Sequence, residues 1–399
     1  MAEGALNGVR VLEVGNFMAG PFCTLQLADL GADVVKIENP DGGDLTRGSA
    51  PFIQGESSPF IRLNRNKRSL VLDLKSERGK EVFRRLARKA DVVVENLRPG
   101  TMAELGLDYG RLSELNPRLV YVAASGWGQD GPYAQRPGLD IMAQAMSGLM
   151  SITGEEGGRN PVKIGVPMTD LVCALYGALA AMAALRVRDR TGRGQFIDVC
   201  LFEAGVSFAV WEAGRFFATG EVPKPLGSAH QASAPYQALR ASDGFFTAGA
   251  TSQKNWECMC DALGLGQLKS DARFAKNHLR HQNRRELIPL IEEVTSRGPA
   301  KEWVKKLQAA GVPCALIQTY DQVFTDPHLI ERGFFPEAPH SKLGPVKQLG
   351  SPMRLSDTPT RMLRAGPLLG EHSAEVLAEA GYTQEEIRQL AGAGVIRTP

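Results

Sequence analysis

Short apolar runs alternate with helix-like stretches along the first half of the chain. Residues 9–14 (VRVLEV) and 34–38 (VVKIE) read as strands, and Gly20–Leu30 between them reads as a helix. A strand, a helix and a second strand within about 30 residues form a βαβ unit. The alternation continues with strands expected at 70–72, 91–95 and 118–123 and a helix at 76–90. Because such repeats build parallel sheets with helices on both faces, we expect an α/β fold.

The second half repeats this alternation after a break. The longest apolar run, residues 171–185, predicts a buried helix, since it is shorter than the ~18–20 residues of a membrane span. A Pro-, Gly- and Ser-containing stretch at 220–234 reads as a linker or an active-site loop. A second module is then expected from a strand at 245–248 and helices near 253–263, 284–296 and 300–310. At 399 residues, two consecutive domains are the default expectation.

Composition and charge exclude several classes of protein. Lys and Arg number 46 against 44 Asp and Glu, a net charge of +2, so there is no nucleic-acid footprint. The six cysteines are scattered, which argues against a disulfide framework, and Cys258-Met259-Cys260 lacks a zinc spacing. No metal site is expected. The first residues lack a charged segment followed by an apolar one, so we expect no secretory signal and a cytoplasmic location.

Asp170 carries the strongest local chemical signal. It follows Gly165-Val166-Pro167-Met168-Thr169 and directly precedes the long apolar helix. Proline suits the first helical positions, and Thr169 or Asp170 suits the first turn. A carboxylate there lies at the positive end of the helix dipole, which favours its ionised form. On local sequence alone it is either a helix cap or a nucleophile.

Other local patterns leave alternatives open. The junction Gly15–Pro21 is not GxGxxG, so a nicotinamide or flavin cofactor has no motif support, although the loop remains either a site wall or a plain turn. Asn96 and Arg98 end a strand at a Pro-Gly turn and could hold a phosphate or an amide. His230 lies in a flexible loop, as a ligand contact or as a surface residue.

Ordered motifs along nearly the whole chain resemble the class III CoA-transferases, the CaiB/BaiF family. They are, in order, residues 8–13 (GVRVLE), 19–22 (AGPF), 31–38 (GADVVKIE), 43–47 (GDLTR), 64–69 (NRNKRS), 94–96 (VEN), 125–132 (SGWGQDGP), 191–195 (TGRGQ) and 367–372 (PLLGEH). Within the family the chain is most similar to the succinate–hydroxymethylglutarate CoA-transferase type. The segments that carry this likeness are residues 227–230 (GSAH), 235–238 (PYQA) and 276–280 (KNHLR).

The resemblance implies a fold and a mechanism. It implies a large Rossmann-like, CoA-binding domain at 1–220 and 330–399, a smaller α/β domain with linkers at 221–329, and an interlocked homodimer. It makes Asp170 the nucleophile, which forms a mixed anhydride with the donor acyl group and then an aspartyl-CoA thioester. Even a two-unit rise in the pKa of Asp170 from ~3.9 would leave about nine tenths of it ionised at pH 7. No permanent cofactor is implied, because coenzyme A is a substrate.

Positions that line the CoA site in the family carry over by residue. They are Met18, Ala19, Leu72, Lys75, Asn96, Leu97 and Arg98. Asn39 and Glu104 stand where a formyl-CoA-transferase-like member has arginines, so phosphate binding differs, with Arg98, Arg136 or Arg47 as substitutes. Backbone amides of the loop at Gly227, Ser228 and His230 are expected to shield the intermediate, although relatives have a more glycine-rich loop there.

The substrate implied is a dicarboxylate, with succinyl-CoA as donor. Its far carboxylate needs a cation, for which Arg47, Arg65 and His230 are candidates. The first alternative is an α-methylacyl-CoA racemase on the same fold, which uses a Gly-His-Asp segment. Here that segment is Gly138-Leu139-Asp140, and leucine cannot carry a proton. We expect Asp140 instead to hydrogen-bond near Asp170. The second alternative is a non-catalytic CoA-binding protein.

Overall fold

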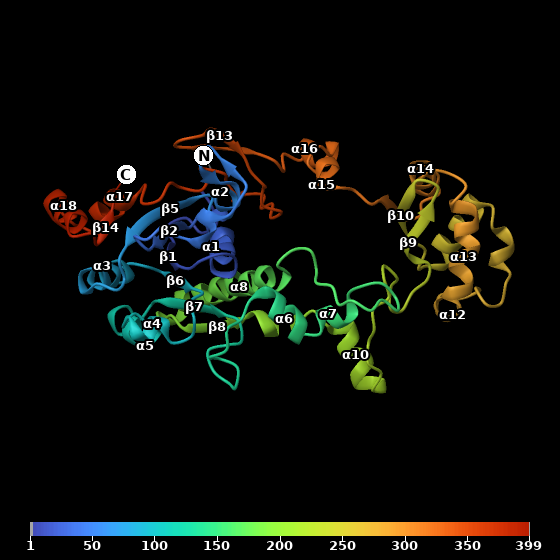
Figure 1. The fold of residues 1–399 in the computed structure, drawn as a ribbon, viewed down its shortest axis with the longest axis horizontal. Coiled ribbons are helices and arrows are strands. Elements are labelled where there is room, and N and C mark those ends of the chain that lie inside the picture. The colour runs from blue at the N-terminus through green and yellow to red at the C-terminus, as the bar shows by residue number, and fades with distance from the viewer. Residues whose placement is uncertain (1–2, 399) are drawn as a thin grey trace. The chain divides into compact units, whose positions relative to one another are not determined.

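A seven-stranded sheet forms the centre of the first of two units in the computed structural model, which describes residues 3–398 (Figure 1). The strand order is β14-β5-β2-β1-β6-β7-β8, and only β14 runs antiparallel to its neighbour. The strands are β1 (Arg10–Val14), β2 (Asp33–Glu38), β5 (Lys67–Leu72), β6 (Val92–Glu95), β7 (Val120–Ser125), β8 (Phe196–Cys200) and β14 (Ile396–Arg397). The predicted parallel α/β sheet is therefore present.

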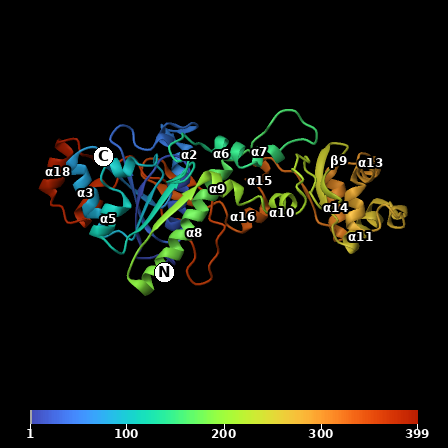
Figure 2. The same ribbon diagram turned by 90° about the horizontal axis from the view of Figure 1, so that it is seen from below.

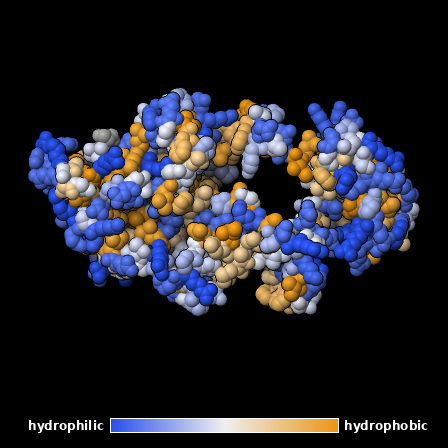
Figure 3. Space-filling model, in the orientation of Figure 1, coloured by the Kyte–Doolittle hydropathy of each residue, from blue (hydrophilic) through white to orange (hydrophobic). Residues whose placement is uncertain are grey.

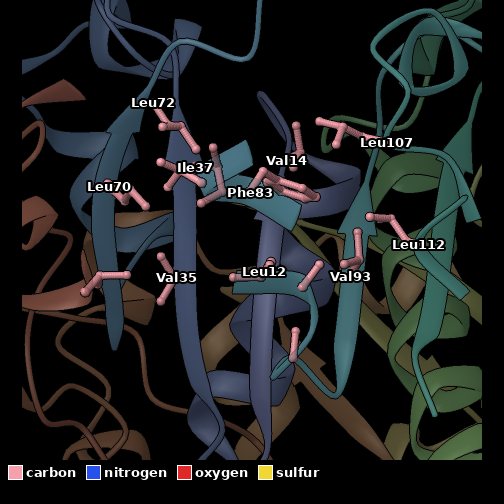
Figure 4. Close-up of a cluster of buried hydrophobic side chains, with 14 of the residues drawn as sticks. Leu12, Val14, Val35, Ile37, Leu70, Leu72, Phe83, Val93, Leu107 and Leu112 are labelled. Carbon is pink, nitrogen blue, oxygen red and sulfur yellow. The ribbon is translucent and has the colours of Figure 1, made fainter. Parts of the chain in front are cut away.

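Helices cover both faces of this sheet (Figure 2). One face is covered by α1 (Ala19–Asp29) and α8 (Met168–Thr191), and the other by α3 (Glu77–Ala87), α5 (Tyr109–Leu115), α17 (Ser373–Glu379) and α18 (Gln384–Gly392). Alternate residues of each strand point to opposite faces. In Figure 4 the side chains of Leu12, Val35 and Val93 lie on the face where Phe83 packs. Residues between them, such as Val11 and Val34, pack against α1 and α8.

The long helix α8 is a core element. By length and composition alone it passes the test for a membrane span, with a mean hydropathy of 1.7 over its best 18-residue window. Its Ala174, Ala178 and Ala181 are buried against the sheet and against α1. Small side chains allow this close approach of helix and strands. The helix extends beyond the predicted 171–185 at both ends, because the polar residues of its last turns lie outside the apolar run.

Further elements of the first unit surround the carboxyl edge of the sheet and the C-terminal segment. The helices are α2 (Ser58–Leu63), α4 (Thr101–Glu104), α6 (Asp140–Met146), α7 (Leu149–Ile152), α9 (Leu201–Val206), α10 (Val210–Thr219) and α16 (Pro327–Glu331), and the ends of α7 and α10 belong to the second unit. Two hairpins are β3 (Phe52–Ile53) with β4 (Glu56–Ser57), and β12 (Glu337–His340) with β13 (Gly344–Lys347). The single helix expected at 201–218 is thus two helices, α9 and α10.

The second unit contains residues Met150–Val162 and Ala218–Asp326. Its three-stranded antiparallel sheet has the order β11-β10-β9, with β9 at Tyr236–Ala241, β10 at Gly244–Gly249 and β11 at Cys314–Leu316. The α-helices that lie wholly in this unit are α11 (Gln253–Leu263), α12 (Asn277–Gln282), α13 (Arg284–Thr295), α14 (Ala300–Ala309) and α15 (Tyr320–Val323). The early segment joins this unit through Gly227, whose amide donates to the Gly154 carbonyl, and through Glu156, which pairs with Arg284 and Arg285.

Candidate active site

Asp170 lies in the first turn of α8, at the carboxyl edge of the central sheet. Helix α8 begins after Pro167, which supplies no side-chain cap. The Asp170 carboxylate lies in the first turn after this proline, as the sequence predicts. The side chain is partly buried. Within residues 3–398 the Asp170 carboxylate makes neither a hydrogen bond nor an ion pair. A cap would bond to backbone amides of its own helix. Asp170 does not, and its oxygens are left available for chemistry.

The capping role belongs to Asp140, the first residue of α6. Its Oδ1 accepts hydrogen bonds from the Thr169 amide at 2.9 Å and the Thr169 hydroxyl at 2.7 Å. Its Oδ2 accepts from Nε2 of Gln144 at 2.7 Å. The Gln144 Oε1 in turn accepts from the Ile164 amide at 2.9 Å, in the segment that leads into α8. Thr169 and Gln144 are fully buried, so this network fixes the backbone beside Asp170.

Burial, and then the nearby charge of Asp140, raise the pKa of Asp170 to about 7. This shift is larger than the two-unit shift considered from the sequence, because no cation pairs with the carboxylate within the described residues. About half of the carboxyl groups are then ionised at pH 7. The helix dipole favours the ionised form, but it does not offset the desolvation. Such a carboxylate is poorly solvated and reactive when charged.

The loop between β1 and α1 contains the predicted positions Met18 and Ala19. Asn96, directly after β6, holds this loop: it accepts from the Asn16 amide at 3.0 Å and donates to the Asn16 carbonyl at 2.9 Å. The Cβ of any residue at position 15 or 20 would run into the Asn96 side chain, so glycine is required at both for packing. The amide of Asn96 therefore supports the loop, and little of its capacity remains for a phosphate.

Basic residues gather at the same edge. Arg98 is exposed and donates to the carbonyl of Gln135, which brings it beside Arg136. The Arg136 guanidinium stacks on the ring of Tyr133 at 3.9 Å. Lys75 follows β5 and is exposed. Leu72 and Leu97 contribute to the hydrophobic core under this edge, so the side chain of Leu72, which is 1% exposed, cannot contact a ligand.

Two of the cations considered for the substrate are occupied elsewhere. Arg47 forms two hydrogen bonds of 2.7 Å to Glu38, donates to the Pro367 carbonyl and stacks on Phe60 at 3.7 Å. Arg65 is buried and pairs with Asp29, the last residue of α1, at 2.5 Å. Helix α1 starts at the carboxyl edge of the sheet, so Asp29 and Arg65 lie toward the opposite edge from Asp170. These contacts argue against a substrate role for either arginine.

The loop with Gly227, Ser228 and His230 belongs to the second unit. Gly227 has a φ of 62°, a conformation that glycine adopts without strain. In this loop, three backbone amides donate hydrogen bonds to carbonyls within the unit, namely those of Gly227, Ala229 and His230. The amide of Ser228 makes no hydrogen bond within the described residues, whereas the Ser228 hydroxyl accepts from the Ala238 amide at 3.0 Å. The His230 ring stacks on Tyr236 at 4.9 Å.

Gln144 is a site residue that the sequence reasoning did not single out, and Thr169 was considered there only as a residue of the first helical turn. Gln144 stands four residues after Asp140 on α6, which is the spacing that brings two side chains together on a helix. That spacing was visible in the sequence. Glu95, at the end of β6, was also overlooked: burial raises its pKa to about 7, although the Leu97 amide donates to it. Among residues 3–398, no group of three His, Cys, Asp or Glu side chains is placed to hold a metal.

Comparison with known proteins places this site in a family. Residues 6–373 match the model of CoA-transferase family III. This chain belongs to CoA-transferase family III. The succinyl-CoA:glutarate CoA-transferase of Mus musculus is 37% identical over 393 residues, which are 98% of this chain and 90% of the mouse protein. The succinate–glutarate CoA-transferase of Agrobacterium fabrum is 38% identical, over 94% of this chain and 95% of that protein.

Solved structures agree with this assignment. A CaiB/BaiF family protein from Brucella suis superposes with a TM-score of 0.84 at 39% identity, covering 95% of this chain and 100% of that one. The class III resemblance inferred from the sequence motifs is therefore confirmed, and the protein is an enzyme of the CoA-transferase class. It acts on CoA thioesters and carboxylates, as the family does.

Proposed function

We propose that this enzyme moves CoA from succinyl-CoA to a dicarboxylate of the glutarate class, with Asp170 as the nucleophile. The observation that carries the proposal is the Asp170 carboxylate itself, which is partly buried, unpaired and fixed in place by its neighbours at the start of α8. The names of the mouse and Agrobacterium relatives supply the donor and acceptor classes. A free carboxylate beside a CoA-binding edge suits acyl transfer that needs no general base.

The proposed reaction has four steps. The Asp170 carboxylate attacks the thioester carbonyl of the donor, and the carbon–sulfur bond breaks to give a mixed anhydride and the CoA thiolate. The thiolate attacks the Asp170 carbonyl of the anhydride, which releases succinate and leaves an aspartyl-CoA thioester. The acceptor carboxylate then displaces the thiolate to form a second anhydride. Attack of the thiolate on the acceptor carbonyl gives the new acyl-CoA and restores Asp170.

Coenzyme A is proposed to bind along the carboxyl edge of the sheet. The backbone of Met18 and Ala19 would line the thiol end, and Lys75, Arg98 and Arg136 would pair with its phosphates. These three basic side chains are exposed at that edge, and phosphate binding by several separated cations is common. The role of oxyanion donor for the Gly227–His230 loop is carried over from the family resemblance alone, and within that loop we assign it to the Ser228 amide, which makes no hydrogen bond among the described residues. For the far carboxylate we retain His230, whose Nδ1 accepts from the Ala232 amide at 3.0 Å, so that its Nε2–H would act as a hydrogen-bond donor.

Covalent trapping tests this mechanism. The enzyme is incubated with succinyl-CoA, treated with hydroxylamine, digested and examined by mass spectrometry. We expect a hydroxamate on the peptide that contains Asp170, and none on the same peptide of Asp170→Ala. A hydroxamate on another carboxylate, or no hydroxamate despite turnover, contradicts the proposal. The acceptor class is tested separately by steady-state rates with glutarate, succinate, formate and carnitine, where equal rates for the last two contradict a dicarboxylate acceptor.

The racemase alternative has less support. Residue 139, before Asp140, is a leucine with 64% of its surface exposed, and it offers no proton-transfer group. Deuterium incorporation at the α-carbon of a 2-methylacyl-CoA, measured without an acceptor, would reveal such an activity. We expect none above the rate of the Asp170→Ala variant.

We further propose that the enzyme is an interlocked homodimer in the cytoplasm. Large apolar side chains are exposed on α10, including Trp211 at 61% and Phe217 at 83%, and hydrophobic residues gather over this helix in Figure 3. Exposed apolar groups of this size indicate a contact surface. All six cysteines are unpaired, which suits a reducing compartment. Light scattering after gel filtration should give twice the monomer mass, and Phe217→Asp should lower it.

A further inference from the structure

Four charged side chains are completely buried beneath the β1–α1 loop. Lys36 on β2 lies 2.5 Å from Glu13 on β1 and 2.7 Å from Asp44, and Lys67 on β5 lies 2.8 Å from Glu13. All four have side chains that are fully inaccessible to solvent. Two cations and two carboxylates balance in charge. The cluster occupies the face of the sheet that α1 covers, where Thr24 of that helix also donates to Glu13.

Such a cluster is a poor way to gain stability. Removing charges from water costs several kcal/mol per ion, and apolar side chains of similar volume often serve as well or better. Valine packs well on this face of the sheet, since Val11 and Val34 lie on the same side, two residues before Glu13 and Lys36. The charges therefore call for an explanation other than packing.

Lys36 and Asp44 hold the backbone of the loop. The Lys36 ammonium donates to the Gly15 carbonyl at 3.0 Å, and Asp44 Oδ1 accepts from the Phe17 amide at 3.2 Å. Phe17 has a φ of 56°, which is unfavourable for a phenylalanine, and its side chain is 50% exposed. A strained residue persists only when its surroundings fix it. Lys36 and Asp44 form an ion pair, so the hydrogen bond to the Gly15 carbonyl and the hydrogen bond from the Phe17 amide belong to one network.

We propose that Lys36 and Asp44 are positioning residues for CoA binding, which hold the β1–α1 loop in the conformation that presents Phe17 and Met18 at the carboxyl edge. The inference rests on the proposed CoA site at that edge. Lys36 and Asp44 do not touch the substrate, since both are buried under the loop. Their effect should therefore fall on binding of the CoA thioester, and the steps on Asp170 should be little changed.

Kinetics of two substitutions at Asp44 test this proposal. Asp44→Ala removes both the ion pair and the acceptor for the Phe17 amide, so we expect KM for succinyl-CoA to rise about tenfold with kcat changed less than about twofold. Asp44→Asn keeps an oxygen that accepts from Phe17 but loses the charge, so its KM should lie between those of wild type and Asp44→Ala. Calorimetric titration with free CoA should give the same order of affinities.

Asp29→Ala is the matched control. It breaks another buried ion pair, with Arg65, at the other end of α1. Its thermal midpoint should fall as much as that of Asp44→Ala, while KM for succinyl-CoA stays that of wild type. Equal rises of KM in both variants would show a general loss of stability and overturn the proposal, as would an unchanged KM in folded Asp44→Ala. Failure of the proposed function is distinguishable, because wild type itself would then transfer no CoA.

Discussion

Asp140 caps the helix that carries Asp170 by accepting both the amide and the hydroxyl hydrogen of Thr169, at 2.9 and 2.7 Å. The cap thus comes from a different helix, 29 residues earlier in the chain. This arrangement frees Asp170 from the role that its position in the first turn would otherwise give it. It also brings a second carboxylate close enough to raise the pKa of Asp170.

The rate should therefore depend on pH through Asp170. Only the ionised carboxylate attacks, so kcat/KM for succinyl-CoA should rise with pH along a limb whose midpoint is near the pKa of about 7. Asp140→Asn removes the second-largest cause of the shift and should move this limb to lower pH, with kcat reduced because the network at Thr169 is altered. Steady-state rates from pH 5 to 9 give the limb, and a flat profile between pH 5.5 and 8 contradicts the assignment.

Asp170→Asn should lower the activity of the enzyme and raise its stability. Loss of the nucleophile should lower kcat by at least about a thousandfold. The folded-state pKa is raised, so the ionised carboxyl destabilises the fold increasingly as pH rises from the unfolded value near 3.8 through about 7. Asn removes that cost, and the free energy of unfolding should increase by about 1–3 kcal/mol at pH 8, and by less at pH 5. Urea unfolding at both pH values measures it, and equal effects at both would contradict the pKa shift.

Replacement of Glu95 should also raise the stability of the enzyme, but without a loss of catalytic activity. Burial raises the pKa of Glu95 to about 7, so its charged form also destabilises the fold as pH rises above the ordinary value near 4.5. Glu95→Gln keeps an oxygen that accepts from the Leu97 amide. We expect its thermal midpoint to exceed that of wild type at pH 8 and to approach it at pH 5. Turnover at saturating succinyl-CoA should stay within about threefold, since Glu95 takes no part in the four steps.

Gly15→Ala should disturb the proposed CoA-binding edge of the sheet through a steric clash alone. The new Cβ would overlap the Asn96 side chain, which must then give up its bonds to Asn16. We expect a destabilisation of about 1–3 kcal/mol and a higher KM for succinyl-CoA. Gly48→Ala is the control, since nothing lies within 4 Å of a Cβ there and its stability and KM should not change. Thermal unfolding and steady-state rates decide the matter, and wild-type values for Gly15→Ala would show that the loop is not tightly packed.

Local pattern was enough for most of the central sheet. The runs at 9–14 and 34–38 are β1 and β2 to within a residue, because each alternates between two buried faces and ends at a polar or glycine residue. The strand expected at 70–72 is longer, Lys67–Leu72, because the buried Lys67 and Arg68 that begin it look like surface residues in the sequence. Their partners, Glu13 and Asp33, are more than thirty residues away along the chain.

By itself the sequence determined the alternating α/β architecture, the position of Asp170 at the start of a long apolar helix, and the family, since each depends on the order and spacing of residues. Only the tertiary structure decided which charges are free. In the folded protein Arg65 forms an ion pair with Asp29, whereas Asp170 is unpaired within the described residues. The physical reason is that periodicity fixes the face to which a side chain points, whereas its partner is fixed by folding. Reactivity in this enzyme depends on the partner.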